Sequence, residues 1–251
     1  MKHVTFGHTK IKYDIKRGKR KKTVALVIQP HATVIVLSPR FLSEDRIRQV
    51  IVKRAGWILE QQEKIKKLRT DYPMKEFVSG ESFPYLGRQY RLKIARSDNL
   101  KNVPCKLIGG RFLIGIDRKS EDKNLSGHVR KKLAEWYRAR AEEKIYERIC
   151  KYAELLGKYP KKIMIRDQQR RWGSCSHTGI IRLNWKIIMA PLSVLDYVIV
   201  HELCHLTLRD HSDKFWNKLG SIIPDYKKKR HWLKENSFLL TELLSYQGYE
   251  K

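Results

Sequence analysis

The sequence predicts an α+β protein, with a β-rich N-terminal region followed by a compact, mainly helical region that includes a small sheet. Three observations lead to this prediction. Short β-branched runs bounded by turn residues fill much of the chain before residue 117. Helical periodicity dominates from residue 125 onward. The charged segment 118–123 separates the two patterns, so we expect domains at residues 1–120 and 121–251.

The first half of the N-terminal region is expected to contain a hairpin and one helix. β-branched runs at residues 23–28 and 33–37 flank a short connection that contains a proline. Ser43 then precedes two acidic residues, a pattern typical of a capped helix start. Apolar residues recur at helical spacing after it, which predicts a helix over about 43–69.

The second half of this region is expected to be β structure. Residues 76–96 contain glycine and proline turn signals between β-prone runs. Two further strands are expected at about 103–108 and 111–116, because Gly109 and Gly110 between them suit a tight hairpin turn.

The C-terminal region is expected to open with a long amphipathic helix over about 125–156, ended by Gly157. Ser193 is expected to cap a later helix that runs to His205, with Asp196 three residues on in a capping-box arrangement. The remaining elements are expected to be short strands at 162–166 and 180–184 and helices at 212–222 and 228–246.

The charge is strongly positive. The chain of 251 residues has 54 Lys and Arg against 26 Asp and Glu, a formal net charge of +28. Such an excess produces a positive field that attracts polyanions, so nucleic acid is a possible partner. A solvated, lysine-rich surface without such a partner explains the composition equally well.

The cysteines and the apolar runs argue against several classes. Four cysteines lie far apart with no C-x-x-C pair, which disfavours a cysteine zinc site or a disulfide scaffold. No apolar stretch approaches the ~20 residues that a membrane span needs, so no membrane association is expected. We therefore expect a cytoplasmic protein.

The stretch with the most chemical content reads His-Glu-Leu-Cys-His at residues 201–205. Residues four apart lie on one face of a helix, so His201 and His205 can reach the same zinc ion, with Glu202 beside it as general base. A catalytic zinc site holds three protein ligands and one water, so a third ligand is needed. His211 is a candidate, although it could instead cap the next helix or lie on the surface.

Four segments together resemble the YgjP-like family of predicted metal-dependent hydrolases, which are similar to small zincin peptidases and, more distantly, to SprT-type proteases. These segments read RWGSCS at 171–176, LNW at 183–185, DYVIVHEL at 196–203 and HSDKFW at 211–216. The resemblance implies a zincin-like domain with one Zn²⁺, held by His201, His205 and His211, and Glu202 as the catalytic residue. It also implies a peptide or protein substrate.

Other roles are assigned more loosely. In zincins a strand before the active-site helix pairs with extended substrate, and this strand is expected to comprise Ile180, Ile181, Arg182, Leu183 and Asn184. Candidates for a donor that stabilises an oxyanion are Arg230, His231, Tyr226 and Tyr197. Ser174 and Cys175 have no evident base partner and are expected to serve packing and turn formation.

A zinc-dependent peptidase is the function that these patterns favour. Two alternatives stay open from the sequence. One is a nucleic-acid-associated protein, such as a DNA-linked protease or accessory factor, that uses its basic surface. The other is a non-catalytic module that zinc stabilises.

Overall fold

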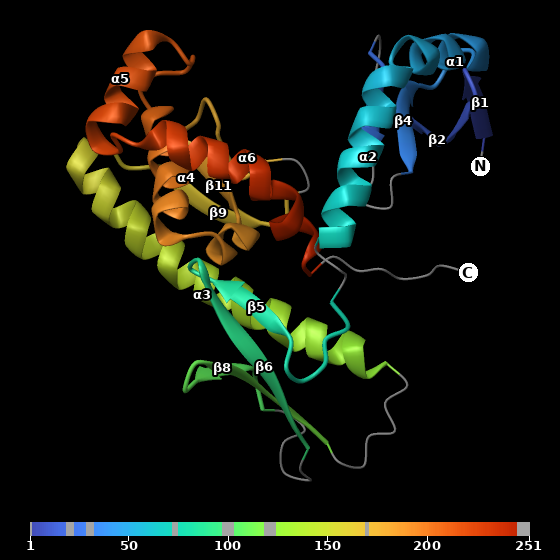
Figure 1. The fold of residues 1–251 in the computed structure, drawn as a ribbon. Helices are drawn as coiled ribbons and strands as arrows, with labels where there is room; N and C mark the ends of the chain where they lie inside the picture. Colours follow the sequence, from blue (N-terminus) through green and yellow to red (C-terminus); the bar gives the residue numbers. More distant parts are fainter. Residues whose placement is uncertain are drawn as a thin grey trace. The chain divides into compact units, whose positions relative to one another are not determined.

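The computed structural model describes residues 2–18, 23–28, 33–71, 75–96, 103–117, 124–168 and 171–244. Helices and small mixed sheets alternate along the chain, which confirms the α+β prediction (Figure 1). The chain forms two compact units, Met1–Met74 and Lys75–Lys251. No helix in the described ranges is long and apolar enough to cross a membrane.

The first unit packs two helices against a four-stranded sheet of order β1-β2-β4-β3. The central strands β2 and β4 run parallel, and each pairs with an antiparallel outer strand. Side chains such as Tyr13, Val36 and Ile51 are fully buried between the sheet and the helices. The elements are β1 (Lys2–Phe6), β2 (Thr9–Gly18), β3 (Ala25–Ile28), β4 (Val34–Pro39), α1 (Glu44–Lys53) and α2 (Ala55–Asp71).

The helix expected over 43–69 is two helices. Ser43 caps α1 as predicted, with its hydroxyl oxygen accepting from the Arg46 amide. Arg54 then leaves helical geometry at φ −110° and ψ 11°, and α2 begins at the next residue. The predicted pairing of the runs near 23–28 and 33–37 is confirmed by the β3–β4 ladder, although the connection 29–32 lies outside the described residues.

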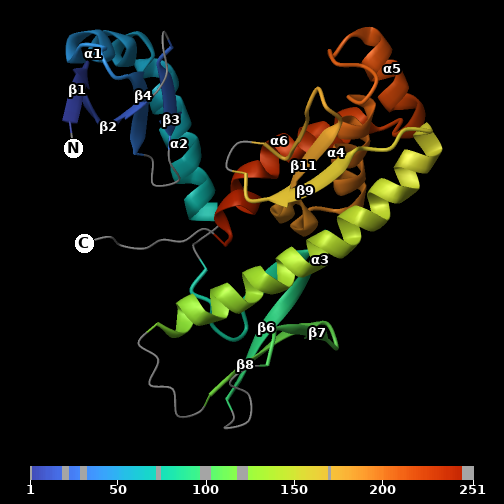
Figure 2. The same ribbon diagram turned by 180° about the vertical axis from the view of Figure 1, so that it is seen from behind.

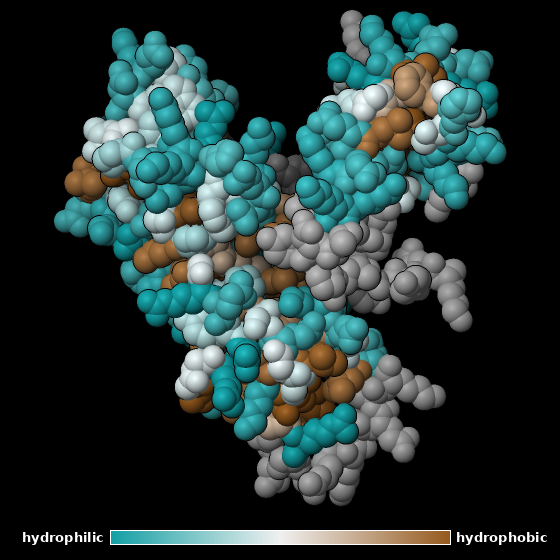
Figure 3. All heavy atoms as spheres, in the orientation of Figure 1, coloured by the Kyte–Doolittle hydropathy of each residue, from teal (hydrophilic) through white to brown (hydrophobic). Residues whose placement is uncertain are grey.

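The second unit begins with another four-stranded sheet, of order β5-β6-β8-β7. Its strands repeat the directions of the first sheet, with parallel central strands and antiparallel outer ones. A helix follows each of the two sheets along the chain, so the two arrangements are alike although their sequences show no evident repeat. The strands are β5 (Ser82–Tyr85), β6 (Arg88–Arg96), β7 (Lys106–Ile108) and β8 (Arg111–Ile116). On the face shown in Figure 3, hydrophobic side chains are visible over this sheet.

Helix α3 (Leu125–Leu156) joins this sheet to the rest of the second unit (Figures 1 and 2). Gly157 ends it in the left-handed conformation, as predicted. The Tyr137 ring packs against Phe112 of β8, and its hydroxyl donates to the Pro84 carbonyl oxygen at 2.6 Å. The compact units therefore divide near residue 74, not at the expected boundary of 120/121, because the aromatic side chains of this sheet share a core with α3. The charged segment 118–123 lies outside the described residues.

The remaining elements surround helix α4 (Leu192–Cys204). A three-stranded sheet of order β10-β11-β9 precedes it in the chain and is followed by a 3-10 turn, η1 (Trp185–Met189). Asn184 links the sheet to η1, since its side-chain Nδ2 atom donates to the Gln168 carbonyl oxygen and its Oδ1 atom accepts from the Lys186 backbone amide. The other elements are β9 (Lys162–Arg166), β10 (Gly173–Cys175), β11 (Ile180–Asn184), α5 (Asp213–Ile222) and α6 (Tyr226–Glu242).

Candidate metal centre

Helix α4 carries the first two histidines and is buried over nearly its whole length. The helix begins at Leu192 after Pro191, so the expected N-cap at Ser193 is wrong. Asp196 is not part of a capping box, because its carboxylate forms a two-point ion pair with Arg148 of α3, at 2.6 and 2.7 Å. This buried pair ties the middle of α4 to α3 and fixes the helix from which His201 projects.

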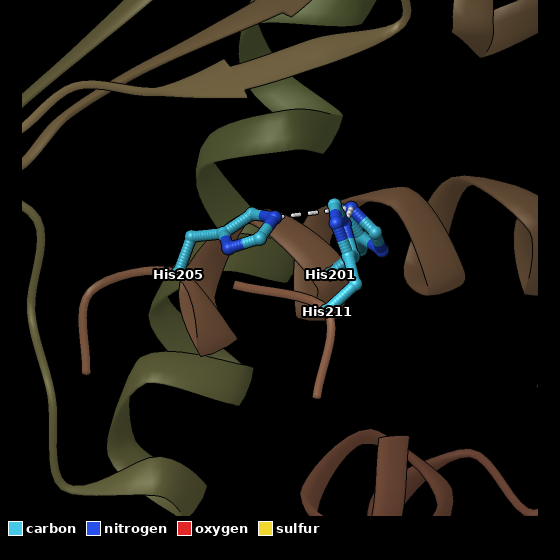
Figure 4. A group of neighbouring side chains, drawn as sticks. All are labelled: His201, His205 and His211. Atoms are coloured by element: carbon cyan, nitrogen blue, oxygen red, sulfur yellow. Dashed lines mark hydrogen bonds between the residues drawn. The ribbon is translucent and has the colours of Figure 1, made fainter. Parts of the chain in front are cut away.

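The three predicted histidines meet at the end of α4. The His201 Nε2 atom lies 3.3 Å from His205 Nε2 and 3.1 Å from His211 Nε2. Figure 4 shows the rings turned toward one another, with His211 returning from the loop after the helix. The nitrogen atoms that face the centre all lie within 4.8 Å of one another. The loop between residues 205 and 211 therefore brings the third imidazole to the other two.

Aromatic side chains of α5 hold these rings in place. The Phe215 ring is fully buried and stacks on His205 with a centroid distance of 4.6 Å. The Trp216 ring stacks on His211 at 5.5 Å. The His205 Nδ1 atom lies 2.9 Å from the Leu208 carbonyl oxygen, which selects the tautomer protonated at Nδ1 and leaves Nε2 as an acceptor.

The cluster fits a divalent metal ion. Ligand nitrogens about 2.05 Å from a tetrahedral zinc ion lie about 3.3 Å apart, which agrees with the separations at His201. Burial, followed by the charges of His205 and His211, lowers the pKa of His201 to about 3. Burial also lowers the pKa of His211. Both shifts favour neutral imidazoles, the form that binds a metal.

Glu202 lies beside the histidines in a nearly dry position. The side chain is 5% exposed, and its Oε2 atom has no hydrogen-bond partner. Burial raises the pKa of this carboxyl to about 8, against the opposing effect of the Arg171 charge. A carboxyl whose pKa lies near neutrality is suited to accept and return a proton.

Strand β10 forms the opposite wall of the site. The histidines, Glu202 and β10 line a pocket of about 310 Å³. Gly173 lies so close to Glu202 that an added Cβ atom would be 2.5 Å from its Oε1 atom. The lining residues are Arg171, Gly173, Ser174, Cys175, His177, His201, Glu202, His205, Arg209 and His211.

Residues 22–236 match the YgjP-like metallopeptidase domain. The chain belongs to this YgjP-like family. Among solved structures, it is similar to the metallopeptidase zymogen of Pyrococcus abyssi abylysin, at 20% identity and a TM-score of 0.34. That similarity covers 37% of this chain and 95% of the other. No curated protein matches the chain.

For this YgjP-like protein, the prediction that residues 180–184 pair with the substrate is wrong. Strand β11, which contains Ile180, Ile181, Arg182, Leu183 and Asn184, is the central strand of its sheet. It is hydrogen-bonded to β10 on one side and to β9 on the other, so it has no free edge. Strand β10 is an outer strand and also lines the pocket.

None of the four expected oxyanion donors lines the pocket of this YgjP-like protein. Tyr197 is buried with its ring 5.9 Å from that of His201. The Trp216 ring stacks against Tyr226 and has the Arg230 guanidinium 5.2 Å from its centroid. His231 is exposed and pairs with Glu235 one turn along α6, so its position does not support a role at the centre.

Several lining residues were not assigned a site role from the sequence. Arg171, Gly173 and Cys175 belong to the RWGSCS segment, in which Ser174 and Cys175 were expected to serve packing and turn formation, and His177 follows this segment. Arg209 lies between His205 and His211 in the sequence, and only these histidines were considered in that stretch. One signal could have identified them, because the RWGSCS segment is one of the four that resemble the family. Its strand, β10, is only three residues long, so no strand periodicity marked it.

Proposed function

We propose that this protein is a zinc-dependent metallopeptidase that binds one Zn²⁺ through His201, His205 and His211. The convergence of three imidazole nitrogens next to a buried carboxylate carries the proposal. When bound, the zinc ion would lower the pKa of a water molecule to about 7. Glu202 would take the proton of the attacking water and pass it to the leaving amine.

Among the described residues, strand β10 pairs only with β11, and its other, free edge offers a place for an extended peptide. The Trp172 carbonyl accepts from the Asn184 amide, and the Ser176 amide donates to the Ile180 carbonyl. Backbone groups alternate in direction along a strand, so those of Gly173 and Cys175 point toward the free edge. We infer that a substrate backbone adds to β10 beside Glu202, in the role first expected of residues 180–184.

Two substitutions test the assignment of the metal and the base. Glu202→Gln keeps the shape of the side chain but removes the proton acceptor, so zinc content should stay near one per chain while peptide hydrolysis is lost. His205→Ala should lose zinc as well as hydrolysis. His8→Gln, in the exposed β1–β2 turn, is the matched control for removal of a histidine.

The outcomes separate the candidate functions. Zinc binding in the wild type without hydrolysis of any peptide would favour the module that zinc only stabilises. The nucleic-acid partner expected from the charge of +28 stays a separate prediction. Affinity for DNA should fall steeply as salt rises if phosphate contacts form, and a flat response would contradict it.

A further inference from the structure

Two arginines line the pocket beside the histidines. Arg171 precedes β10, and Arg209 follows α4 in the loop that leads to His211. Both are exposed residues whose side chains contribute to the pocket wall. Glu202 is the only carboxylate among the described residues that line the pocket. The wall therefore carries more positive than negative charge, before any metal ion is counted.

Arg209 is held in a defined position. Its Nη2 atom donates to the His177 carbonyl oxygen at 3.1 Å, and its Nη1 atom lies 2.6 Å from His177 Nδ1. His177 belongs to the turn between β10 and β11, so the guanidinium bridges the loop after α4 to this turn. A guanidinium has five N–H donors, and these two contacts leave the others available to a ligand.

Neither arginine of the pocket has the kind of partner that three other arginines of this unit have. Arg148 forms its ion pair with Asp196, and Arg140 pairs with Glu143. The Arg230 guanidinium lies over the Trp216 ring. Within the described ranges, neither Arg171 nor Arg209 has a carboxylate at ion-pair distance. One guanidinium binds both oxygens of a carboxylate with paired hydrogen bonds, so each of these arginines can receive a carboxylate at its own end of β10.

We propose that Arg171 and Arg209, at opposite ends of β10, each offer an anion subsite where a carboxylate of the peptide substrate binds near the bond that is cut. This inference rests on the proposed peptidase function, because it assigns that function a substrate class. Two sources supply the same chemistry. One is the side chain of an Asp or Glu within the substrate, and the other is the carboxylate at its C-terminus.

The two sources are separated with two peptide libraries of random sequence incubated with the zinc-loaded protein. Peptides of the first library are acetylated and amidated at their ends, and those of the second have a free C-terminus. Mass spectrometry identifies the cut bonds. Enrichment of Asp or Glu beside the cut in the blocked library indicates an internal acid. Cutting confined to the second library, near its C-terminus, indicates the terminal carboxylate.

Substitutions then test the arginines. In Arg171→Gln and Arg209→Gln, the ratio of kcat/KM for an acidic peptide to that for its Gln or amidated counterpart should fall roughly 10- to 100-fold, the usual size of one charged hydrogen bond. Arg166→Gln, which removes the same charge from β9 and does not line the pocket, should leave the ratio unchanged. Equal cutting of acidic and neutral peptides, or a ratio unaffected in both pocket variants, overturns the subsite and leaves the peptidase proposal standing.

A binding measurement distinguishes failure of the subsite from failure of the peptidase proposal. Zinc-loaded Glu202→Gln protein is titrated with fluorescently labelled acidic peptides and their neutral counterparts, and fluorescence anisotropy reports binding. Tighter binding of the acidic peptide that is lost in Arg209→Gln supports the subsite, even where the wild type cuts nothing. Equal affinity for both peptides, or binding of neither, overturns it.

Discussion

Gly173 and Glu202 are in such close contact that a Cβ atom on Gly173 would lie 2.5 Å from Oε1 and 2.6 Å from Cγ of Glu202. Gly173 does not adopt a left-handed conformation, so the need for glycine arises from space and not from backbone strain. The glycine allows the edge strand to approach Glu202, and an extended substrate on this strand would then lie beside the proposed proton acceptor.

Gly173→Ala should therefore displace Glu202 while the histidines stay in place. Because a misplacement of ~1 Å in a catalytic group costs about 100-fold in rate, kcat should fall on that order. Zinc content measured by mass spectrometry should not change. Gly56→Ala is the control, since no atom lies within 4 Å of its added Cβ. Full activity in Gly173→Ala would contradict the close approach.

Backbone pairing with β10 predicts an alternating dependence on substrate amides. Only the backbone groups of Gly173 and Cys175 face the free edge, so every second substrate residue should bond to it. A series of peptides N-methylated at one amide each should show losses of kcat/KM with a period of two residues. Losses at every amide, or at none, would be inconsistent with strand addition.

Cys175 lines the pocket but should not act as a nucleophile. Burial, together with the Glu202 charge, raises the pKa of its thiol. A raised pKa favours the neutral thiol at pH 7, whereas the thiolate is the reactive form. Cys175→Ser should keep hydrolysis within about threefold of the wild type, by the usual small effect of a near-isosteric change. Complete loss of hydrolysis with zinc retained would point to covalent chemistry.

The Arg148–Asp196 pair should contribute to stability through helix α4. The two side chains are 13% and 10% exposed, so removing one partner leaves a largely buried charge. Asp196→Asn should lower the free energy of unfolding by about 3 kcal/mol. Glu143→Gln, which breaks the exposed Arg140 pair on α3, should change it by less than about 0.5 kcal/mol. Urea unfolding of the zinc-free proteins measures both.

The sequence was sufficient where the decisive signal was local. The spacing of His201 and His205 on one helix follows from helical geometry, and the chain returns His211 to them within a short loop. The strand that would pair with a substrate could not be predicted from such a local signal. Strand β10 has three residues, too few to show periodicity, and its edge position depends on how β9 and β11 pair.

The extent of the catalytic unit follows from long-range packing that the composition does not reveal. The shift in composition at 118–123 suggested a boundary there, yet Phe112 of β8 packs on Tyr137 of α3. The tip of the β5–β6 hairpin also contacts the other side of the unit, since the Leu86 amide donates to the Ile188 carbonyl at 2.9 Å. The strands β5–β8 are therefore part of the fold that carries the histidines.

A fragment of residues 75–251 should accordingly fold and bind zinc without the first unit, whereas residues 121–251 should not. The shorter fragment lacks Phe83, Leu92, Phe112 and Ile114, and it therefore loses the roughly 6–12 kcal/mol that the burial of four such side chains contributes, an amount comparable to the whole stability of a typical domain. Thermal unfolding and zinc content compare the two fragments with the full chain. A cooperative transition and one zinc per chain in 121–251 would show that the sheet is dispensable, and would restore the boundary that the composition suggested.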